Sequence, residues 1–85
     1  MERILGPIKG YYIASCTCQM GELGKEYLGF AKVCLAKPVD FRSAQSLSDV
    51  SSDAVMPTAQ GAMERAELRA RIAIANMSAC VDTSA

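Results

Sequence analysis

The residues with the greatest capacity for chemistry in this sequence are its four cysteines, Cys16, Cys18, Cys34 and Cys80. Cys16 and Cys18 alternate along a segment with strand character, so both thiols are expected on one face of that strand. A structural zinc site of four thiolates needs two pairs of closely spaced cysteines, whereas this chain has one pair and two single cysteines. The pattern favours reduced core thiols over a metal or redox site. Cys34, on the outward face of its predicted strand, is the candidate for a reactive thiol.

The other groupings that resemble catalytic or cofactor-binding motifs are incomplete. Residues 21–25, GELGK, resemble the end of a phosphate-binding loop but lack its spacing and lie between two predicted strands. Glu64 and Glu67 lie on a predicted helix but point about 60° apart, among arginines, as is typical of a solvated charged face. Histidine, the commonest general base, is absent. We therefore predict no enzyme, and no catalytic, cofactor-binding or metal-binding residues.

Aromatic and basic residues on the predicted strands could in principle stack single-stranded nucleic acid. They are Tyr11, Tyr12, Tyr27 and Phe30, with Lys9, Lys25 and Lys32. The nine Lys and Arg residues are balanced by nine Asp and Glu, for a net charge of zero. A neutral chain lacks the positive charge that draws proteins to phosphate backbones, so nucleic acid is not the favoured partner.

Targeting signals and membrane segments are not evident in the sequence. No apolar run approaches the roughly 18 residues of a membrane span, and the N-terminus lacks the apolar core of a secretory signal. We predict a cytoplasmic protein that does not enter the membrane.

The chain has the length of one small domain, residues 1–85. Chains of this size gain stability from disulfides, metals or oligomerisation, and a net charge of zero leaves little repulsion against self-association. Gly6, Pro7 and Gly10 suggest an irregular lead-in over residues 1–10, and residues 82–85 are expected to fray.

Three strands are predicted. Residues 11–20 alternate, and their even positions, from Tyr12 to Met20, are predicted to face the core. Residues 21–26 form a hairpin loop with two glycines. Residues 27–37 form the second strand with its odd positions inward, ending at Pro38. Residues 47–55, rich in serine and aspartate, suit an edge strand.

A single long helix is predicted over Pro57–Met77, with Thr58 as its N-cap. At helical spacing, one stripe of mostly small apolar residues faces the sheet. It consists of Ala59, Met63, Ala66, Ala70, Ala73, Ile74, Met77 and Val81. Glu67 and Arg71 are predicted to form an ion pair on the helix surface. The fold class is α+β, a three-stranded antiparallel sheet (β-β-β-α) with the C-terminal helix on one face.

A second apolar stripe lies on the opposite side of the helix, where a simple two-layer fold requires polar residues. Its members are Gly61, Leu68, Ile72, Ala75 and Ala79. They are either scattered surface apolar residues or a protein interface, and we favour an interface that makes the chain a homodimer.

Four residues stand at characteristic places in this order of elements: Tyr27 at the start of the second strand, and Thr58, Ala62 and Ala66 at the start of the helix. In these residues and in its layout the chain resembles the HicB-type β-β-β-α module and the many small bacterial proteins that share this layout. The resemblance implies an antitoxin-like partner that dimerises and masks an RNA-cleaving toxin. The chain departs from that pattern because it lacks the glycine-rich acidic hairpin, the proline in the second strand and the DNA-binding segment after the helix. No functional residue is carried over.

Overall fold

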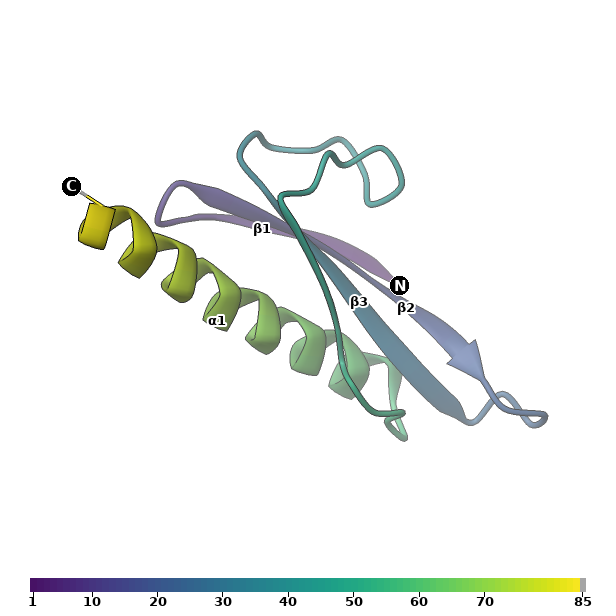
Figure 1. Cartoon of the computed structure of the whole chain (residues 1–85). Helices are drawn as coiled ribbons and strands as arrows, with labels where there is room; N and C mark the ends of the chain where they lie inside the picture. Colours follow the sequence, from purple (N-terminus) through teal and green to yellow (C-terminus); the bar gives the residue numbers. More distant parts are fainter. Residues whose placement is uncertain (85) are drawn as a thin grey trace.

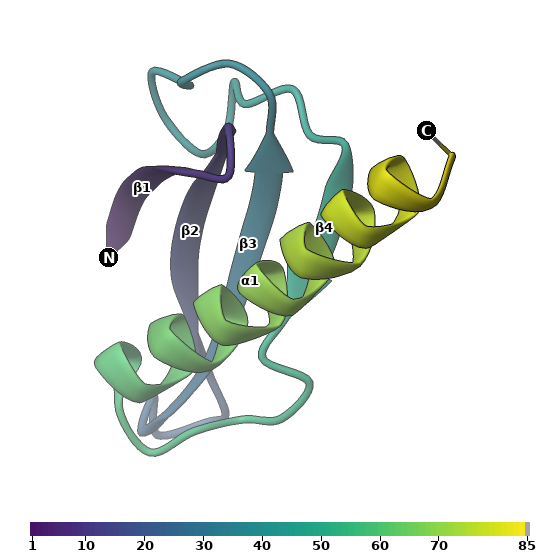
Figure 2. The same cartoon turned by 90° about the vertical axis from the view of Figure 1, so that its left-hand side faces the viewer.

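The computed structural model describes the backbone of residues 1–84 and the side chains of residues 1–77. Four strands form one antiparallel sheet in the order β1-β2-β3-β4, and helix α1 crosses one face of it (Figures 1 and 2). The strands span Glu2–Ile8 (β1), Tyr11–Met20 (β2), Glu26–Cys34 (β3) and Ser48–Ser51 (β4), and α1 spans Ala59–Ser84. The α+β class is confirmed, with four strands where three were predicted.

The additional strand is β1, which occupies the segment predicted to be an irregular lead-in. Its pairing with β2 shifts register between Leu5 and Ile8, around Gly6 and Pro7. Lys9 and Gly10, with φ of 51° and 86°, then form the two-residue turn into β2. Two positive φ values are those of a type I′ hairpin turn, which matches the twist of paired strands. Glycine and proline therefore mark a bulge and a tight turn here.

The predicted inward face of β2 is wrong. Ile13 and Ser15, at odd positions, are fully buried on the side of the helix. They pair across the sheet with Val33 and Ala31 of β3, whose odd face was correctly predicted to be inward. The even positions of β2, including Cys16 and Cys18, therefore lie on the face away from α1.

The edge strand β4 is shorter than the predicted segment 47–55 but lies at the edge as expected. Beyond it, Ser52 continues the pairing: its N–H donates to the Gly29 carbonyl at 2.8 Å, and its hydroxyl accepts from the Gly29 N–H at 3.1 Å. A final bridge joins Tyr27 to Met56. These contacts bring the chain along β3 to the start of the helix.

Helix α1 begins where the sequence predicts. The Thr58 hydroxyl accepts a hydrogen bond from the Gly61 N–H at 3.0 Å, as an N-cap residue does. Within the predicted core stripe, Met63, Ala66, Ala70 and Ile74 are buried. Ala59, Ala73 and Met77 are half-buried, and the side chain of Val81 lies outside the described residues.

The C-terminal end of α1 differs from the prediction. The backbone remains helical through Ser84, beyond Met77 and through most of the predicted frayed segment 82–85, whereas Ala85 lies outside the described residues. Within the described residues, no helix combines the length and the apolar character that crossing a membrane requires.

The helix approaches the sheet most closely at Gly29 of β3. A Cβ at this position would lie 2.1 Å from the carbonyl oxygen of Ala62 and 3.2 Å from the Cβ of Ala66. Only glycine permits the two backbones to approach this closely. The small residues of the helix stripe thus serve close packing between α1 and β3.

Candidate functional site

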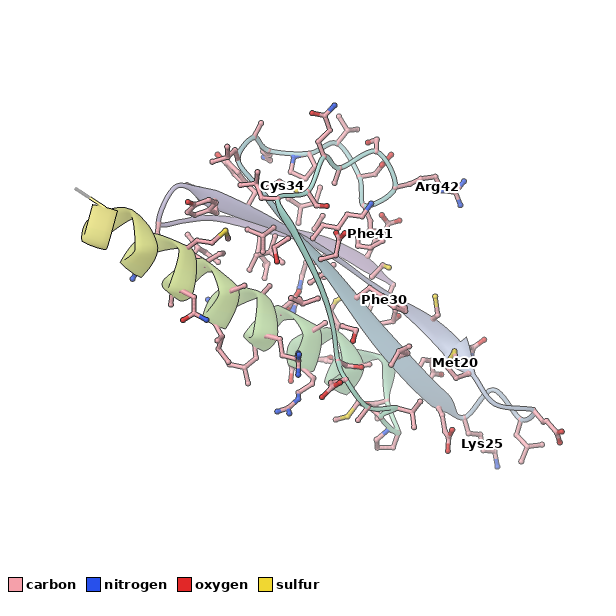
Figure 3. All side chains as sticks on the ribbon, in the orientation of Figure 1. Met20, Lys25, Phe30, Cys34, Phe41 and Arg42 are labelled. Atoms are coloured by element: carbon pink, nitrogen blue, oxygen red, sulfur yellow. The ribbon has the colours of Figure 1, made fainter. Side chains whose placement is uncertain are left out.

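The face of the sheet opposite α1 carries apolar side chains that no helix covers. They come from alternate positions of two neighbouring strands: Cys16, Cys18 and Met20 of β2, and Leu28 and Phe30 of β3. Cys18 and Met20 are exposed, and the other three are half-buried. Met20 and Phe30 lie on the side of the sheet away from the helix (Figure 3). We call these five residues the open-face cluster.

The connection between β3 and β4 folds over one end of this face. Its Phe41 is held by Lys32, whose ammonium donates to the Phe41 carbonyl at 3.0 Å and lies 4.5 Å from the centre of its ring. The Phe41 N–H donates to the Glu2 carboxylate at 2.9 Å. The connection therefore covers the face near Lys32, while the end that bears Met20 stays open (Figure 3).

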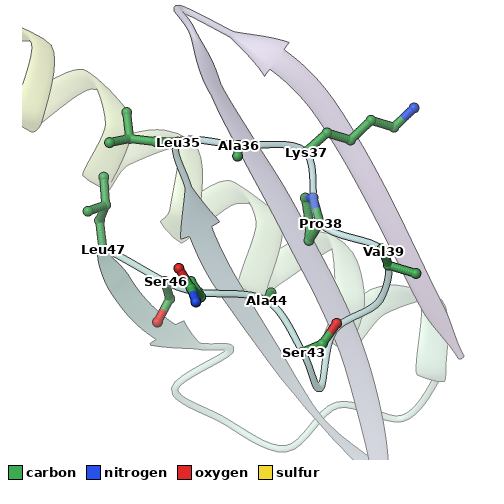
Figure 4. A pocket seen from close by; sticks show the side chains of 10 residues that line it. Leu35, Ala36, Lys37, Pro38, Val39, Ser43, Ala44, Ser46 and Leu47 are labelled. Atoms are coloured by element: carbon green, nitrogen blue, oxygen red, sulfur yellow. The ribbon is translucent and has the colours of Figure 1, made fainter.

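A turn at residues 40–43 stiffens this connection. The Asp40 carboxylate accepts from both the N–H and the hydroxyl of Ser43 at 2.7 Å. These hydrogen bonds lower the pKa of Asp40. The connection itself encloses a hollow of about 510 Å³, bordered by exposed Leu35, Val39 and Leu47 (Figure 4). The lining residues are small, apolar or neutral apart from Lys37, so the hollow brings no catalytic set together.

A second hollow, of about 400 Å³, lies on the open face itself. Cys16, Cys18, Phe30, Lys32 and Phe41 are among the residues that line it. Its lining is almost wholly apolar apart from the Lys32 and Asp49 side chains. Two thiols and two aromatic rings thus meet at one concave surface.

The three cysteines with described side chains differ in accessibility. Cys34, predicted to be the reactive thiol, lies on the face away from the helix as expected but is only 1% exposed. Burial raises the pKa of Cys34 and also that of Cys16, which disfavours the reactive thiolate. Cys18 is the exposed thiol of the three. The prediction for Cys34 is therefore wrong, and the side chain of Cys80 lies outside the described residues.

The predicted interface on the back of the helix is partly exposed. Leu68 and Ile72 are 49% and 53% exposed, and Ala75 is exposed as well. Gly61 has a local explanation, because a Cβ there would lie 2.9 Å from the N-cap hydroxyl of Thr58. The side chain of Ala79 lies outside the described residues.

A buried polar cluster joins β1, β2 and α1, and the sequence did not indicate it. The Glu67 carboxylate, on a residue only 4% exposed, accepts from the Arg3 Nε at 2.9 Å and from the Ser15 hydroxyl at 2.7 Å. A second Arg3 nitrogen bonds the other carboxylate oxygen. Glu67 therefore pairs with Arg3, and the predicted surface pair with Arg71 is wrong. The Glu67 carboxylate raises the pKa of the Arg3 guanidinium further above its usual range.

The remaining predicted groupings separate in space. Tyr11 packs against the core on the helix side, whereas Phe30 belongs to the opposite face. The aromatic residues thus do not form one stacking platform. Residues 21–25 form the hairpin loop between β2 and β3. Among residues with described side chains, no three His, Cys, Asp or Glu groups converge on a possible metal position.

Comparisons with known proteins add no relatives: no family model, curated protein or solved structure matches the chain.

Proposed function

We propose that this chain is a non-enzymatic protein-interaction module that self-associates through the open face of its sheet. The observation that carries the proposal is the open-face cluster. An antiparallel sheet packed on one side normally presents polar residues on the other. Here Cys18 and Met20 are exposed beside half-buried Leu28 and Phe30, and uncovered apolar surface of this kind marks interaction sites.

A second copy of the chain is the partner that fits this surface. The open-face cluster is apolar, the charges around it on the same face have both signs (Glu2, Glu26 and Asp49 with Lys32), and the net charge of the chain is zero, so little repulsion opposes self-association. Stacked sheets pack about 10 Å apart, and a two-fold arrangement would place the two sheets between the two helices. The chain is only 14 Å across its shortest axis, so this pairing would turn two thin layers into a four-layer sandwich with a shared core.

The helix surface around Leu68, Ile72 and Ala75 is the competing interface. Hollows of about 380 Å³ and 320 Å³ flank it, but they are bordered by Arg65, Arg69 and other charged groups. Charged side chains are depleted at the centres of interfaces. The paired positions at the centre of the open face, Cys16 with Phe30 and Cys18 with Leu28, carry no charge, so the open face is the better surface.

Sedimentation equilibrium with three variants tests the proposal. Met20→Glu places a charge on the open face, Ile72→Glu places one on the helix, and Leu23→Glu at the hairpin loop is the control, because Leu23 is 79% exposed. We expect a wild-type dimer at micromolar concentration that only Met20→Glu dissociates, by at least about tenfold in Kd. Dissociation by Ile72→Glu alone would move the interface to the helix. A wild-type monomer at high micromolar concentration would refute self-association.

The alternative is an antitoxin-like or nucleic-acid-binding module, and we propose a cytoplasmic location for either function. The four residues of the HicB resemblance have local roles in this fold: Thr58 caps the helix, Ala62 and Ala66 pack against β3, and Tyr27 pairs with Met56. The resemblance therefore supports an architecture more than an activity. Binding of labelled single- or double-stranded RNA in a gel-shift assay would favour the alternative.

A further inference from the structure

A groove runs between helix α1 and the edge strand β4, on the side of the molecule away from β1 (Figure 2). Its volume is about 380 Å³, and Val50 lines it from β4. The helix lines it with residues that recur every three or four positions and so share one side of α1. They are Arg65, Leu68, Arg69, Ile72, Ala73 and Asn76. From the first to the last of them the helix rises about 16 Å, the length of about five residues of extended chain.

The outer edge of β4 carries backbone groups that face no other strand. In the described part of the chain, β4 is the last strand of the sheet and pairs only with β3. The Ser52 N–H points to β3, where it donates to the Gly29 carbonyl at 2.8 Å. Backbone groups alternate in direction along an antiparallel strand, so those of Asp49 and Ser51 point outward. An edge of this kind is a template for one further strand.

The groove beside this edge is positively charged. Arg65 and Arg69 lie one helical turn apart, a spacing at which like charges destabilise a helix. Among the described residues, no ion pair involves Arg65, and Arg69 binds only the Asp53 carboxylate, at 3.2 Å. The Asp53 side chain is 70% exposed, so this pair is weak and easily exchanged. The Arg69 Nε is buried without an acceptor, and a carboxylate that binds the guanidinium in place of Asp53 would satisfy this donor.

We propose that this groove binds an extended, acidic peptide segment of another protein, which joins the sheet as an antiparallel strand beside β4. The peptide backbone pairs with Asp49 and Ser51, and its alternate side chains point toward α1. A carboxylate at one of these positions lies near the two arginines of the groove. Apolar side chains two residues away pack against Leu68 and Ile72, which are 49% and 53% exposed. The bound segment thus buries apolar surface that the fold leaves in water.

The inference goes beyond the proposed self-association and does not depend on it. The groove lies at the β4 edge on the helix side of the sheet, whereas the open-face cluster belongs to β2 and β3 on the opposite face. A dimer that binds no acidic peptide would refute the groove alone. A monomer that binds the peptide would refute self-association alone.

Amide NMR titration of the full-length chain with the peptide acetyl-Thr-Leu-Thr-Glu-Thr-Leu-Thr-amide tests the proposal. In an extended peptide the Leu and Glu side chains share one face, and the Glu carboxylate is the only charge. We expect binding that shifts the amide signals of Asp49 and Ser51 and of the helix residues along the groove. With Gln in place of Glu, the affinity should fall about tenfold, as for the loss of one charged hydrogen bond. With Pro in place of the two central Thr, which removes the N–H groups that face β4, binding should be lost.

Four protein variants assign the site. Arg65→Gln should weaken binding about two- to fivefold, the usual range for an exposed charge pair, and Ile72→Glu should weaken it at least about tenfold. Asp53→Asn frees the Arg69 guanidinium and should tighten binding about twofold, while asparagine tolerates the positive φ of 65° at this position. Arg71→Gln is the matched control, because Arg71 is exposed on the same helix but does not line the groove, and it should bind as the wild type does.

Circular dichroism of each variant confirms that it is folded. Three results would each overturn the proposal: no binding of the Glu peptide, equal affinity for the Glu and Gln peptides, or amide shifts confined to the open-face cluster. An equal loss of affinity in Arg71→Gln and Arg65→Gln would also overturn it, because the charge of the helix as a whole would then be responsible.

Discussion

Replacement of Gly29 by alanine is the sharpest test of how α1 sits on the sheet. The new Cβ would lie 2.1 Å from the carbonyl oxygen and 2.6 Å from the carbonyl carbon of Ala62. Ordinary contacts begin at 3.4 Å, so the two backbones must separate by about 1.3 Å. A gap of 0.5–1 Å already removes roughly a quarter to a half of the dispersion energy of the contacts across it. The cost therefore extends along the helix–sheet interface.

We expect Gly29→Ala to lower the free energy of unfolding by about 3 kcal/mol or more, at or above the upper end of the usual cost of overpacking. This is a large part of the roughly 4–13 kcal/mol that a domain of this size has in total. Urea denaturation followed by circular dichroism measures it. With a slope of about 1–3 kcal/mol/M, the midpoint falls by at least about 1 M.

Two further variants identify the cause of that loss. Gly10 has a φ of +86° and no atoms within 4 Å of a built Cβ, so Gly10→Ala should cost only the backbone strain, about 1–2 kcal/mol. In the double variant Gly29→Ala/Ala66→Gly, stability should not recover, because the nearest atoms belong to the Ala62 backbone. Ordinary surface substitutions change the free energy of unfolding by less than about 0.5 kcal/mol. A change that small in Gly29→Ala would refute the close approach of α1 to β3.

Three other changes follow from individual contacts. Arg3→Ala leaves the buried Glu67 carboxylate without its cation and should lower the free energy of unfolding by about 1–2 kcal/mol. This is somewhat below the usual contribution of a charged hydrogen bond, because Arg3 is partly exposed. The double variant Arg3→Met/Glu67→Met removes both charges and should recover most of that loss in chemical denaturation. Thr58→Ala removes the N-cap acceptor of α1 and should lower the unfolding free energy by about 1 kcal/mol, against no change for Gln60→Ala in the same assay. The pKa of Asp40 is lowered in the fold from its ordinary value of 3.8, so ionised Asp40 contributes to the free energy of unfolding above that pH, and the contribution is lost as pH falls through the lower folded pKa. Measured against pH, the stability of Asp40→Asn should lack this acid-dependent component. An unchanged profile would contradict the turn.

The helix was the most predictable element because its evidence is local. The Thr58 cap, the spacing of Met63, Ala66, Ala70 and Ile74, and the burial of that stripe all agree with the sequence. The cap marks where the helix begins, and the spacing of the small residues marks its buried face. Both signals depend only on neighbours within a few positions of the sequence. By contrast, β1 was missed because Pro7 and Gly10 usually end strands, and only its pairing with β2 shows that they belong to a bulge and a turn.

The buried polar cluster could not be predicted from local pattern. Ser15 and Glu67 are 52 positions apart and Arg3 lies 64 positions from Glu67. Each of the three residues alone is typical of a solvated surface. The burial of Ser15 and Glu67 is acceptable because they bond to each other and to Arg3, and that condition is visible only once β1 and β2 lie beside α1.

The inward face of β2 was predicted from its alternating side chains alone, and the length of the hairpin loop shows why the even positions cannot face the helix. A predicted loop of residues 21–26 pairs Met20 with Tyr27 and so places even positions of β2 opposite odd positions of β3. The observed loop is one residue shorter: Met20 pairs with Glu26, and even positions pair with even ones. Side chains alternate with a period of two, so one residue moves a whole strand face from core to surface. Once odd positions of β3 face the helix, Ile13 and Ser15 must do so as well, and Cys16, Cys18 and Met20 must lie on the open face. The same one-residue difference therefore places the open-face cluster on the side of the sheet that α1 leaves uncovered.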